Sequence, residues 1–178
     1  MTSFYIRPAT VIDITALEKL VNSAFRGESS RQGWTSEADL LDGIRIDKLA
    51  LQEMIDTPGA VILNYYGEEH TLMGCVFLQK QESKLYLGML TVSPFKQSKG
   101  IGKQLMLAAE SYAISNNCTS ITMNVLYDRE ELTGWYLRQG FYLTGEQKKF
   151  PDDTRFGIPK KKLFFQIMQK DLIYRNAR

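Results

Sequence analysis

The spacing of apolar residues changes along the chain, and each pattern predicts a different kind of element. Over residues 14–25 the large apolar side chains recur every three or four positions, as in an amphipathic helix. After Thr57-Pro58-Gly59 the pattern becomes extended, with apolar runs at 60–66, 71–79 and 84–92 separated by short polar turns. Strand-like runs joined by such turns predict an antiparallel meander.

The pattern is less regular before this meander. Residues 4–7 predict a short strand, and the polar, glycine-containing stretch 26–34 predicts a loop. A second helix is predicted over about 35–55, although Gly43 and Asp47 interrupt its apolar stripe.

Helical and extended patterns alternate in the second half of the chain. The pattern predicts a helix at 101–116, a strand at 121–126, a helix at 130–138, a strand from Gly140 onward, a loop at 149–162 and a last strand at 163–169. The strand–helix–strand segment 85–126 is a crossover, which places two strands parallel. The sequence therefore predicts an α+β fold with a mixed, mostly antiparallel sheet flanked by helices. No linker or repeat divides its 178 residues, so we expect one domain, 1–178.

Composition and charge exclude several classes of function. Lys and Arg number 22 against 20 Asp and Glu, a net charge of +2 that argues against a nucleic-acid partner. The longest apolar runs, such as 72–78, are far shorter than the ~20 residues that span a bilayer, so we expect no membrane partner. Arg7 and Asp13 stand where a signal peptide would need an apolar core, which favours a cytoplasmic location. With two Cys and one His, we expect no disulfide framework and no metal.

The most informative stretch is 92–103 (VSPFKQSKGIGK), where a strand ends and a helix begins behind two glycines. A helix N-terminus leaves about four N–H groups unpaired and carries roughly half a positive charge. Glycines allow a phosphate to approach the backbone, and Lys99 and Lys103 add charge, so the stretch is typical of a diphosphate cradle. Neither common nucleotide motif fits its spacing. On this loop alone, a helix that merely follows a glycine turn with solvated lysines remains an equal alternative.

Three segments in the right order resemble the GCN5-related N-acetyltransferase (GNAT) superfamily. Residues 97–102 (QSKGIG) resemble its Q/R-x-x-G-x-G/A signature, and 90–94 (LTVSP) resemble the strand before it. Residues 135–141 (WYLRQGF) resemble its Tyr-x-x-x-Gly-Phe segment, and the opening FYIRP its first strand. The resemblance covers about residues 3–171, which are expected to form the core of the domain.

The resemblance implies acetyl-CoA as the acyl donor and an amine as the acceptor. In this family two parallel strands splay apart, and the pantetheine arm of the cofactor lies in the gap. The implied contacts to this arm are made by Leu90, Thr91 and Val92, with the backbone of Leu90 and Val92 polarising the thioester. The implied contacts to the pyrophosphate are made by Gln97, Ser98, Lys99, Gly100, Ile101, Gly102 and Lys103.

Tyr136 matches the family tyrosine that protonates the departing thiolate. A phenol with a pKa near 10 is protonated at neutral pH and can serve as this acid. The alternative is an aromatic side chain that packs beside Trp135 and Phe141. Residues 84–97 contain no Asp or Glu, so the base on the fourth strand of many relatives is missing. Three explanations for deprotonation of the amine stay open: water takes the proton, a base from elsewhere in the chain takes it, or the amine arrives neutral.

Arg129 stands where many relatives have an Asn that touches CoA. It is predicted to contact the cofactor, by binding a phosphate, or simply to cap the following helix. In this family the connection between the first two helices forms the acceptor wall, here with Phe25, Arg31, Trp34 and Glu37 as candidate substrate-binding residues. Glu37 is of the type that attracts an amine cation, and Arg31 of the type that binds a carboxylate. The alternative is a solvated loop on which Trp34 packs.

Together these features predict an N-acetyltransferase that moves the acetyl group of acetyl-CoA to the primary amine of a small molecule. Transfer is expected by direct attack in a ternary complex. Two alternatives stay open: a non-catalytic sensor that binds acyl-CoA, and an acetyltransferase that acts on a protein amine. A homodimer is possible, and the sequence does not name the acceptor.

Overall fold

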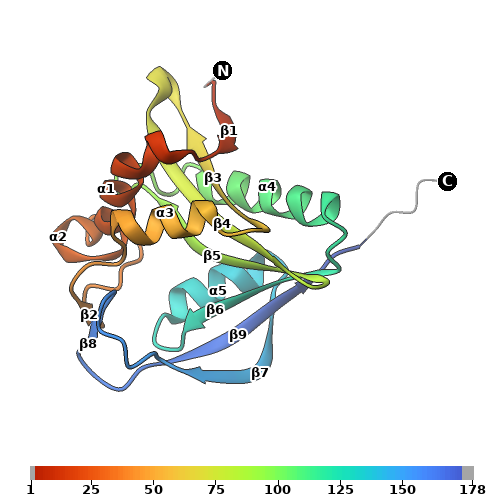
Figure 1. The fold of residues 1–178 in the computed structure, drawn as a ribbon. Helices are drawn as coiled ribbons and strands as arrows, with labels where there is room; N and C mark the ends of the chain where they lie inside the picture. The colour runs from red at the N-terminus through yellow and green to blue at the C-terminus, as the bar shows by residue number, and fades with distance from the viewer. Residues whose placement is uncertain (1–2, 174–178) are drawn as a thin grey trace.

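A computed structural model describes residues 3–173, which form a seven-stranded sheet covered by helices on both faces (Figure 1). The sheet order is β1-β3-β4-β5-β6-β9-β7, and β2 pairs with β8 in a separate two-stranded sheet. The strands are β1 Tyr5–Pro8, β2 Leu41–Asp42, β3 Ala60–Tyr66, β4 Leu72–Gln81, β5 Lys84–Val92, β6 Ser120–Leu126, β7 Tyr142–Lys149, β8 Ile158–Pro159 and β9 Phe164–Asp171. The helices are α1 Ile14–Phe25, α2 Gly27–Ser30, α3 Lys48–Asp56, α4 Ile101–Ser115 and α5 Glu130–Arg138, with 3-10 turns at Val11–Asp13 and Glu68–His70.

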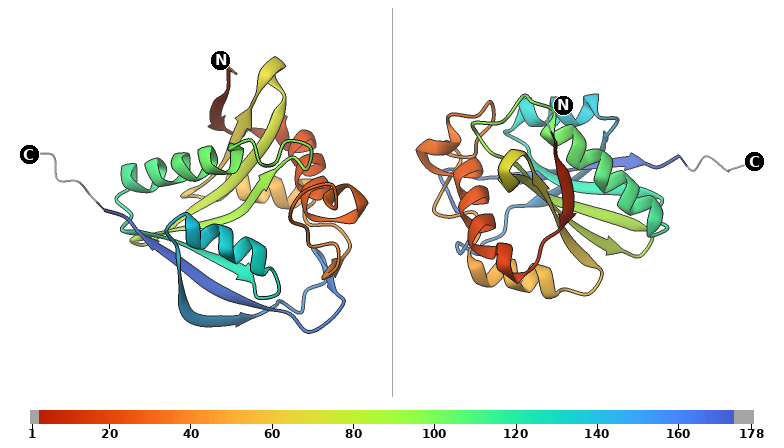
Figure 2. Two further views of the ribbon diagram at one scale, coloured as in Figure 1. Left: turned by 180° about the vertical axis from the view of Figure 1, so that it is seen from behind. Right: turned by 90° about the horizontal axis from the view of Figure 1, so that it is seen from above.

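Each face of the sheet carries its own hydrophobic core. Helices α1 and α3 pack on one face, where Leu17 and Leu51 are fully buried. Helices α4 and α5 cover the other face, where Leu105 and Tyr136 pack against the inner strands (Figure 2). Apolar stripes at helical spacing therefore meet alternating apolar positions on the strands from both sides.

The predicted fold class is confirmed, including its single parallel strand pair among the described residues. Strand β5 pairs with β4 antiparallel and with β6 parallel, and all other neighbours in the large sheet are antiparallel. The β5–β6 pairing ends at Tyr86 and Thr122, although both strands continue for several residues. The two strands therefore diverge, as the resemblance implied.

A β-bulge at Met89 accompanies this divergence. The register between β4 and β5 shifts by one residue there, and Met89 has a positive φ of 50°. Leu85 and Leu87 belong to the core under α4, whereas Met89 belongs to the core under α1. The bulge thus reverses which side chains of β5 face each core, at the point where the strand leaves its parallel neighbour.

The predicted helix over 35–55 is wrong in its first half. Residues 35–47 form irregular structure with the short β2, and α3 begins only at Lys48. The reason is Asp47, whose Oδ1 accepts a hydrogen bond from the Ala50 N–H at 2.8 Å and caps the helix. Within the predicted loop 26–34 the structure has the one-turn helix α2, and within the predicted loop 149–162 the short β8.

The predicted domain, 1–178, extends beyond what can be described. Residues 1, 2 and 174–178 lie outside the described residues. Between residues 3 and 173, none of the helices has the length and apolarity needed to cross a bilayer.

Candidate functional site

A cavity of about 630 Å³ opens where β5 and β6 diverge. Its floor is the end of each strand, including Leu90, Thr91 and Val92 of β5, all named from the sequence. The N-terminus of α4 and one side of α5 form further walls, and the segment from α1 to β2 closes the remaining side. The gap in the sheet is therefore a cavity bounded by polar groups from four different segments.

The start of α4 supplies unpaired backbone donors to this cavity. Gly100 sits at the N-cap with φ +80°, and the first backbone hydrogen bond of the helix runs from the Gln104 N–H to the Gly100 carbonyl. The amides of Ile101, Gly102 and Lys103 precede that first bond and have no carbonyl partner in the helix. These three residues line the cavity, which gives it a positively polarised corner.

The other predicted cradle residues are placed differently. Ser98, which has a φ of +64°, lines the cavity beside Gly100, but Lys99 does not. The Gln97 side chain is already engaged, because its Nε2 donates to the Val92 carbonyl at 3.2 Å and its Oε1 accepts from the Trp34 N–H at 2.8 Å. Gln97 therefore ties the loop before α4 to the segment that carries Trp34.

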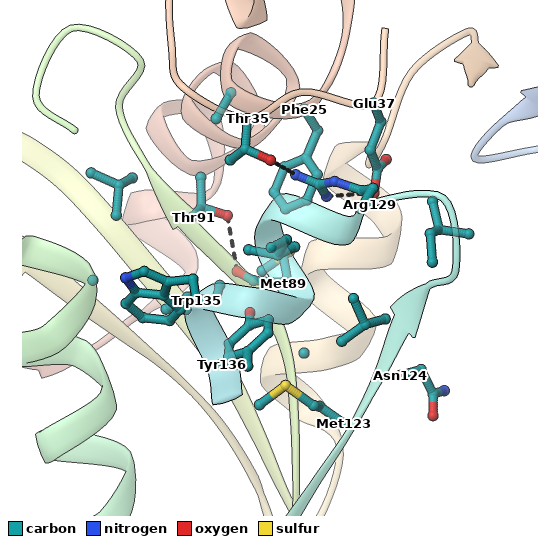
Figure 3. Close-up of a pocket in the computed structure, with 18 of the residues that line it drawn as sticks. Phe25, Thr35, Glu37, Met89, Thr91, Met123, Asn124, Arg129, Trp135 and Tyr136 are labelled. Atoms are coloured by element: carbon teal, nitrogen blue, oxygen red, sulfur yellow. Dashed lines mark hydrogen bonds and ion pairs between the residues drawn. The ribbon is translucent and has the colours of Figure 1, made fainter. Parts of the chain in front are cut away.

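Tyr136 projects from α5 into the cavity. Its side chain is 5% exposed, packs edge-on against Trp135 and Phe141, and its hydroxyl points toward β5 at Met89 (Figure 3). Burial raises the pKa of Tyr136 to about 12. Its hydroxyl makes no hydrogen bond with any other described residue. The group is thus a protonated phenol with a free donor, held in a wall of the cavity.

Two arginines share one carboxylate in the opposite wall. Glu37 Oε2 accepts from Arg26 Nε at 3.1 Å, and Glu37 Oε1 accepts from an Arg129 Nη at 3.2 Å; all three residues are buried. Arg129 also donates to Thr35 Oγ1 at 2.6 Å (Figure 3). Burial lowers the pKa of Arg26, but the adjacent Glu37 carboxylate opposes this shift.

The placement of Arg129 bears on its predicted contact with the cofactor. Its backbone does occupy the N-cap position of α5, but its guanidinium is turned toward Glu37 and Thr35. The side chain therefore belongs to the wall made by the α1–β2 segment, away from the free amides of α4.

The structure brings Phe25, Trp34 and Glu37 to the cavity but leaves Arg31 outside it. Arg31 follows the one-turn helix α2 and forms surface ion pairs with Glu28 at 3.2 Å and Asp39 at 2.8 Å. The proposed binding of a substrate carboxylate by Arg31 has no support in this geometry.

Sequence reasoning missed several residues that line the cavity. Arg45 falls in the half of the predicted helix 35–55 that does not form, and Phe150 and Phe156 lie in the long loop before β9. Asp47 is a residue type typical of helix N-caps, and this signal could have placed the start of the helix after Arg45. No comparable pattern marks the loop residues, because they come to the cavity through tertiary packing alone.

The sheet, the diverging parallel pair and the helix N-terminus beside it together form an acetyltransferase-like fold. The sequence matches the acetyltransferase (GNAT) family over residues 16–141, and the chain belongs to this family. No curated protein matches the sequence.

Solved structures show the same fold. The ribosomal-protein-S18-alanine N-acetyltransferase of Escherichia coli superposes with a TM-score of 0.72 at 11% identity, over 99% of each chain. The protein yncA of Salmonella typhimurium, solved with its cofactor acetyl-CoA, gives a TM-score of 0.68 at 18% identity, over 99% of this chain and 98% of that one. A spermidine N-acetyltransferase chimera from Vibrio cholerae and hSSAT gives 0.67 at 14% identity, over 95% of each. At these low identities the likeness shows a shared fold alone.

Proposed function

We propose that this protein transfers the acetyl group of acetyl-CoA to the primary amine of a small molecule, in a ternary complex. The observation that carries the proposal is the cavity between β5 and β6, which has unpaired amides of α4 at one side and the Tyr136 hydroxyl in another wall. Family membership supports the reaction class, and the neighbour solved with acetyl-CoA supports the choice of donor.

The residues present fit acetyl-CoA. The amides of 101–103 and the side chain of Lys103 suit its pyrophosphate, because a helix N-terminus favours anions. Gly102 has Trp135 3.5 Å from where its Cβ would be, so the backbone and the indole form a close wall. The end of β5, residues 90–92, pairs with β4 but no longer with β6, and its edge toward β6 suits the amide groups of the pantetheine arm. When bound, acetyl-CoA supplies an acetyl group that is already activated as a thioester.

Tyr136 is proposed to give its proton to the departing sulfur. With its pKa raised to about 12, the phenol stays protonated throughout the working pH range. Among the described residues, the carboxylates that line the cavity are Glu37 and Asp153. Glu37 is bound by two arginines, and Asp153 is exposed with its Oδ1 on the Arg155 N–H, so neither suits a general base. We propose that the amine is bound neutral or first loses a proton to water. The proton that the nitrogen releases after attack passes to water, and Tyr136 regains a proton from water after CoA leaves as its thiol.

The walls of the cavity favour a small acceptor over a protein. Thr35 Oγ1 donates to Glu131 at 2.9 Å and accepts from Arg129, while the Trp34 N–H is bound by Gln97. The segment 34–35 is thus fastened both to the loop before α4 and to α5. A protein chain would have to break these bonds to thread between them, whereas a small amine would not.

The test is to detect the product. Protein, acetyl-CoA and a panel of amino acids, polyamines, aminoglycosides and short peptides are incubated, and acetylated amines are identified by mass spectrometry. We expect at least one small amine to be acetylated only when the enzyme is present. CoA binding by calorimetry without any product would favour the acyl-CoA sensor instead. Absence of CoA binding would overturn both functions.

A further inference from the structure

The charged groups that line the cavity are unevenly balanced. Among the described residues they comprise five basic and two acidic side chains, namely Arg26, Arg45, Lys103, Arg129, Arg138, Glu37 and Asp153. Lys103 lies in the first turn of α4, at the proposed pyrophosphate site, and Arg138 lies in the last turn of α5. That leaves three arginines facing the proposed acceptor side, with Glu37 as the one buried carboxylate between them.

Arg26 and Arg129 are both engaged by the protein, although the buried Arg129 Nε makes no hydrogen bond among the described residues. Each binds one oxygen of Glu37, Arg129 also binds Thr35, and Arg26 also donates to the carbonyls of Ile44 at 3.1 Å and Phe156 at 3.0 Å. These two guanidiniums therefore hold the wall together. Their terminal nitrogens are occupied by Glu37, Thr35 and backbone carbonyls, and are therefore not available to a ligand.

Arg45 is different, because its guanidinium has no acidic or carbonyl partner in the described part of the chain. It lines the cavity, half-buried, with its guanidinium carbon 5.3 Å from the centre of the Phe25 ring. Its nearest acidic neighbour in sequence, Asp47, is bound by Arg155 at 3.2 Å. An arginine stacked on an aromatic ring keeps all of its N–H donors available for a planar oxyanion.

The backbone of Arg45 is held in place by α1. Asn22 Oδ1 accepts from the Arg45 N–H at 2.8 Å and the Ile46 N–H at 3.1 Å, and Asn22 Nδ2 donates to the Ile46 carbonyl at 2.9 Å. A side chain carried on so firmly bonded a segment is preorganised, which lowers the entropic cost of binding.

A second free polar group, the Tyr86 hydroxyl, belongs to the same cavity as Arg45 and the proposed acid. Tyr86 lines the cavity and leans over Gly88, whose Cβ would lie 3.2 Å from the Tyr86 hydroxyl. Burial raises the pKa of Tyr86, and Arg45 opposes this shift; burial and, to a smaller extent, Tyr86 raise the pKa of Tyr136. Arg45, Tyr86 and Tyr136 therefore line one cavity and are near enough to influence one another electrostatically.

We propose that Arg45 binds the carboxylate of the acceptor, and that the acceptor is an amino acid. This inference rests on the proposed function and names its substrate class. A carboxylate on Arg45 neutralises the unpaired guanidinium, and the adjacent amine then lies on the Tyr136 side of the cavity. The polyamines and other purely cationic amines are disfavoured, because they would bring further positive charge to a wall already rich in arginine.

The test compares amino acids with their primary amides. Acceptor-dependent thiol release from acetyl-CoA is measured for glycine, β-alanine, L-methionine, L-phenylalanine and L-glutamate, and for the amide of each. We expect kcat/KM for the best acid to exceed that of its amide at least tenfold. Arg45→Met should remove this preference by raising KM for the acid at least tenfold, with little change for the amide or for acetyl-CoA. Arg45→Lys should retain part of the preference.

Arg31→Met is the matched comparison, because Arg31 is the arginine that lies outside the cavity; its acid-to-amide ratio should equal that of the unmodified protein. The proposal would be overturned if amides gave the same kcat/KM as the acids, or if Arg45→Met lowered kcat/KM equally for both.

If no amine is acetylated, the proposed function fails, and the carboxylate site is judged by calorimetric titration of the same acids and amides into the CoA-bound protein. Acid binding that Arg45→Met abolishes then supports the site, and no difference between acid and amide rejects it.

Discussion

At the scale of single residues, the site depends on groups whose chemistry is set by burial. Tyr136 is the clearest case, since the same enclosure that removes it from water keeps its phenol protonated and leaves its hydroxyl free. Tyr136→Phe keeps the ring contacts with Trp135 and Phe141 but removes the proton donor. We expect kcat to fall about 100-fold, the typical scale of a lost general acid, with acetyl-CoA affinity nearly unchanged. Steady-state kinetics with calorimetry checks this, and unchanged kcat would exclude the acid role.

Glu37 is expected to matter for stability, because it separates two buried guanidiniums. Glu37→Gln leaves Arg26 and Arg129 without a counter-charge, which should lower the free energy of unfolding by about 3 kcal/mol. Urea unfolding followed by circular dichroism measures this. Glu28→Gln is the matched control, because Glu28 is 92% exposed and its ion pair with Arg31 lies at the surface. Equal midpoints for the two variants would contradict the structural role of Glu37.

At the scale of elements, the start of α4 is expected to decide cofactor affinity. Gly100 has φ +80°, a conformation that a β-branched residue adopts only with strain, so Gly100→Val should distort the N-terminus of α4. We expect the Kd for CoA to rise at least about tenfold in calorimetry. Gly145→Val is the control, since Gly145 has φ +86° and equally open surroundings but lies on β7. If Gly145→Val weakens CoA binding as much, the effect is a general one and the cradle is not supported.

The elements also show what the sequence could predict. The meander, α4 and α5 follow from apolar spacing together with turn residues, and α5 matches its predicted bounds, 130–138. The false helix over 35–47 arose because apolar residues there happen to repeat at helical spacing, while the Asp47 cap sets the true start of α3. For this reason the sequence pattern did not indicate that Arg45 lines the cavity. The bulge at Met89 exchanges the two faces of β5, and the adjacent apolar residues Met89 and Leu90 are too weak a signal to predict it from the sequence.

At the scale of the whole molecule, the two faces of the sheet contribute different residues to the cavity between β5 and β6. The α4–α5 face supplies the amides and Tyr136, whereas the α1 face supplies Phe25 and, through the following segment, Glu37 and Arg45. Donor and acceptor are thus expected to meet at the split end of the sheet. Residues from both the predicted loop and the predicted acceptor wall line the cavity, whereas Lys99 of the loop and Arg31 of the wall do not.

The pH dependence follows from the enclosure of the site. An acid is active in its protonated form, below its pKa, and the pKa of Tyr136 is raised to about 12. The rate should therefore rise with pH as the acceptor amine loses its proton, and should show no fall below about pH 10. A pH profile of kcat in the unmodified protein checks this. A descending limb near neutral pH would mean that a different acid protonates the sulfur.

Direct transfer needs no nucleophile on the protein, and both cysteines are buried, Cys75 with its pKa raised to about 12 by burial. The most direct test of the account is thiol release measured over a grid of acetyl-CoA and acceptor concentrations. We predict intersecting double-reciprocal lines and no release above background without acceptor. Parallel lines with release in the absence of acceptor would indicate an acetylated enzyme and contradict direct transfer in the cavity between β5 and β6.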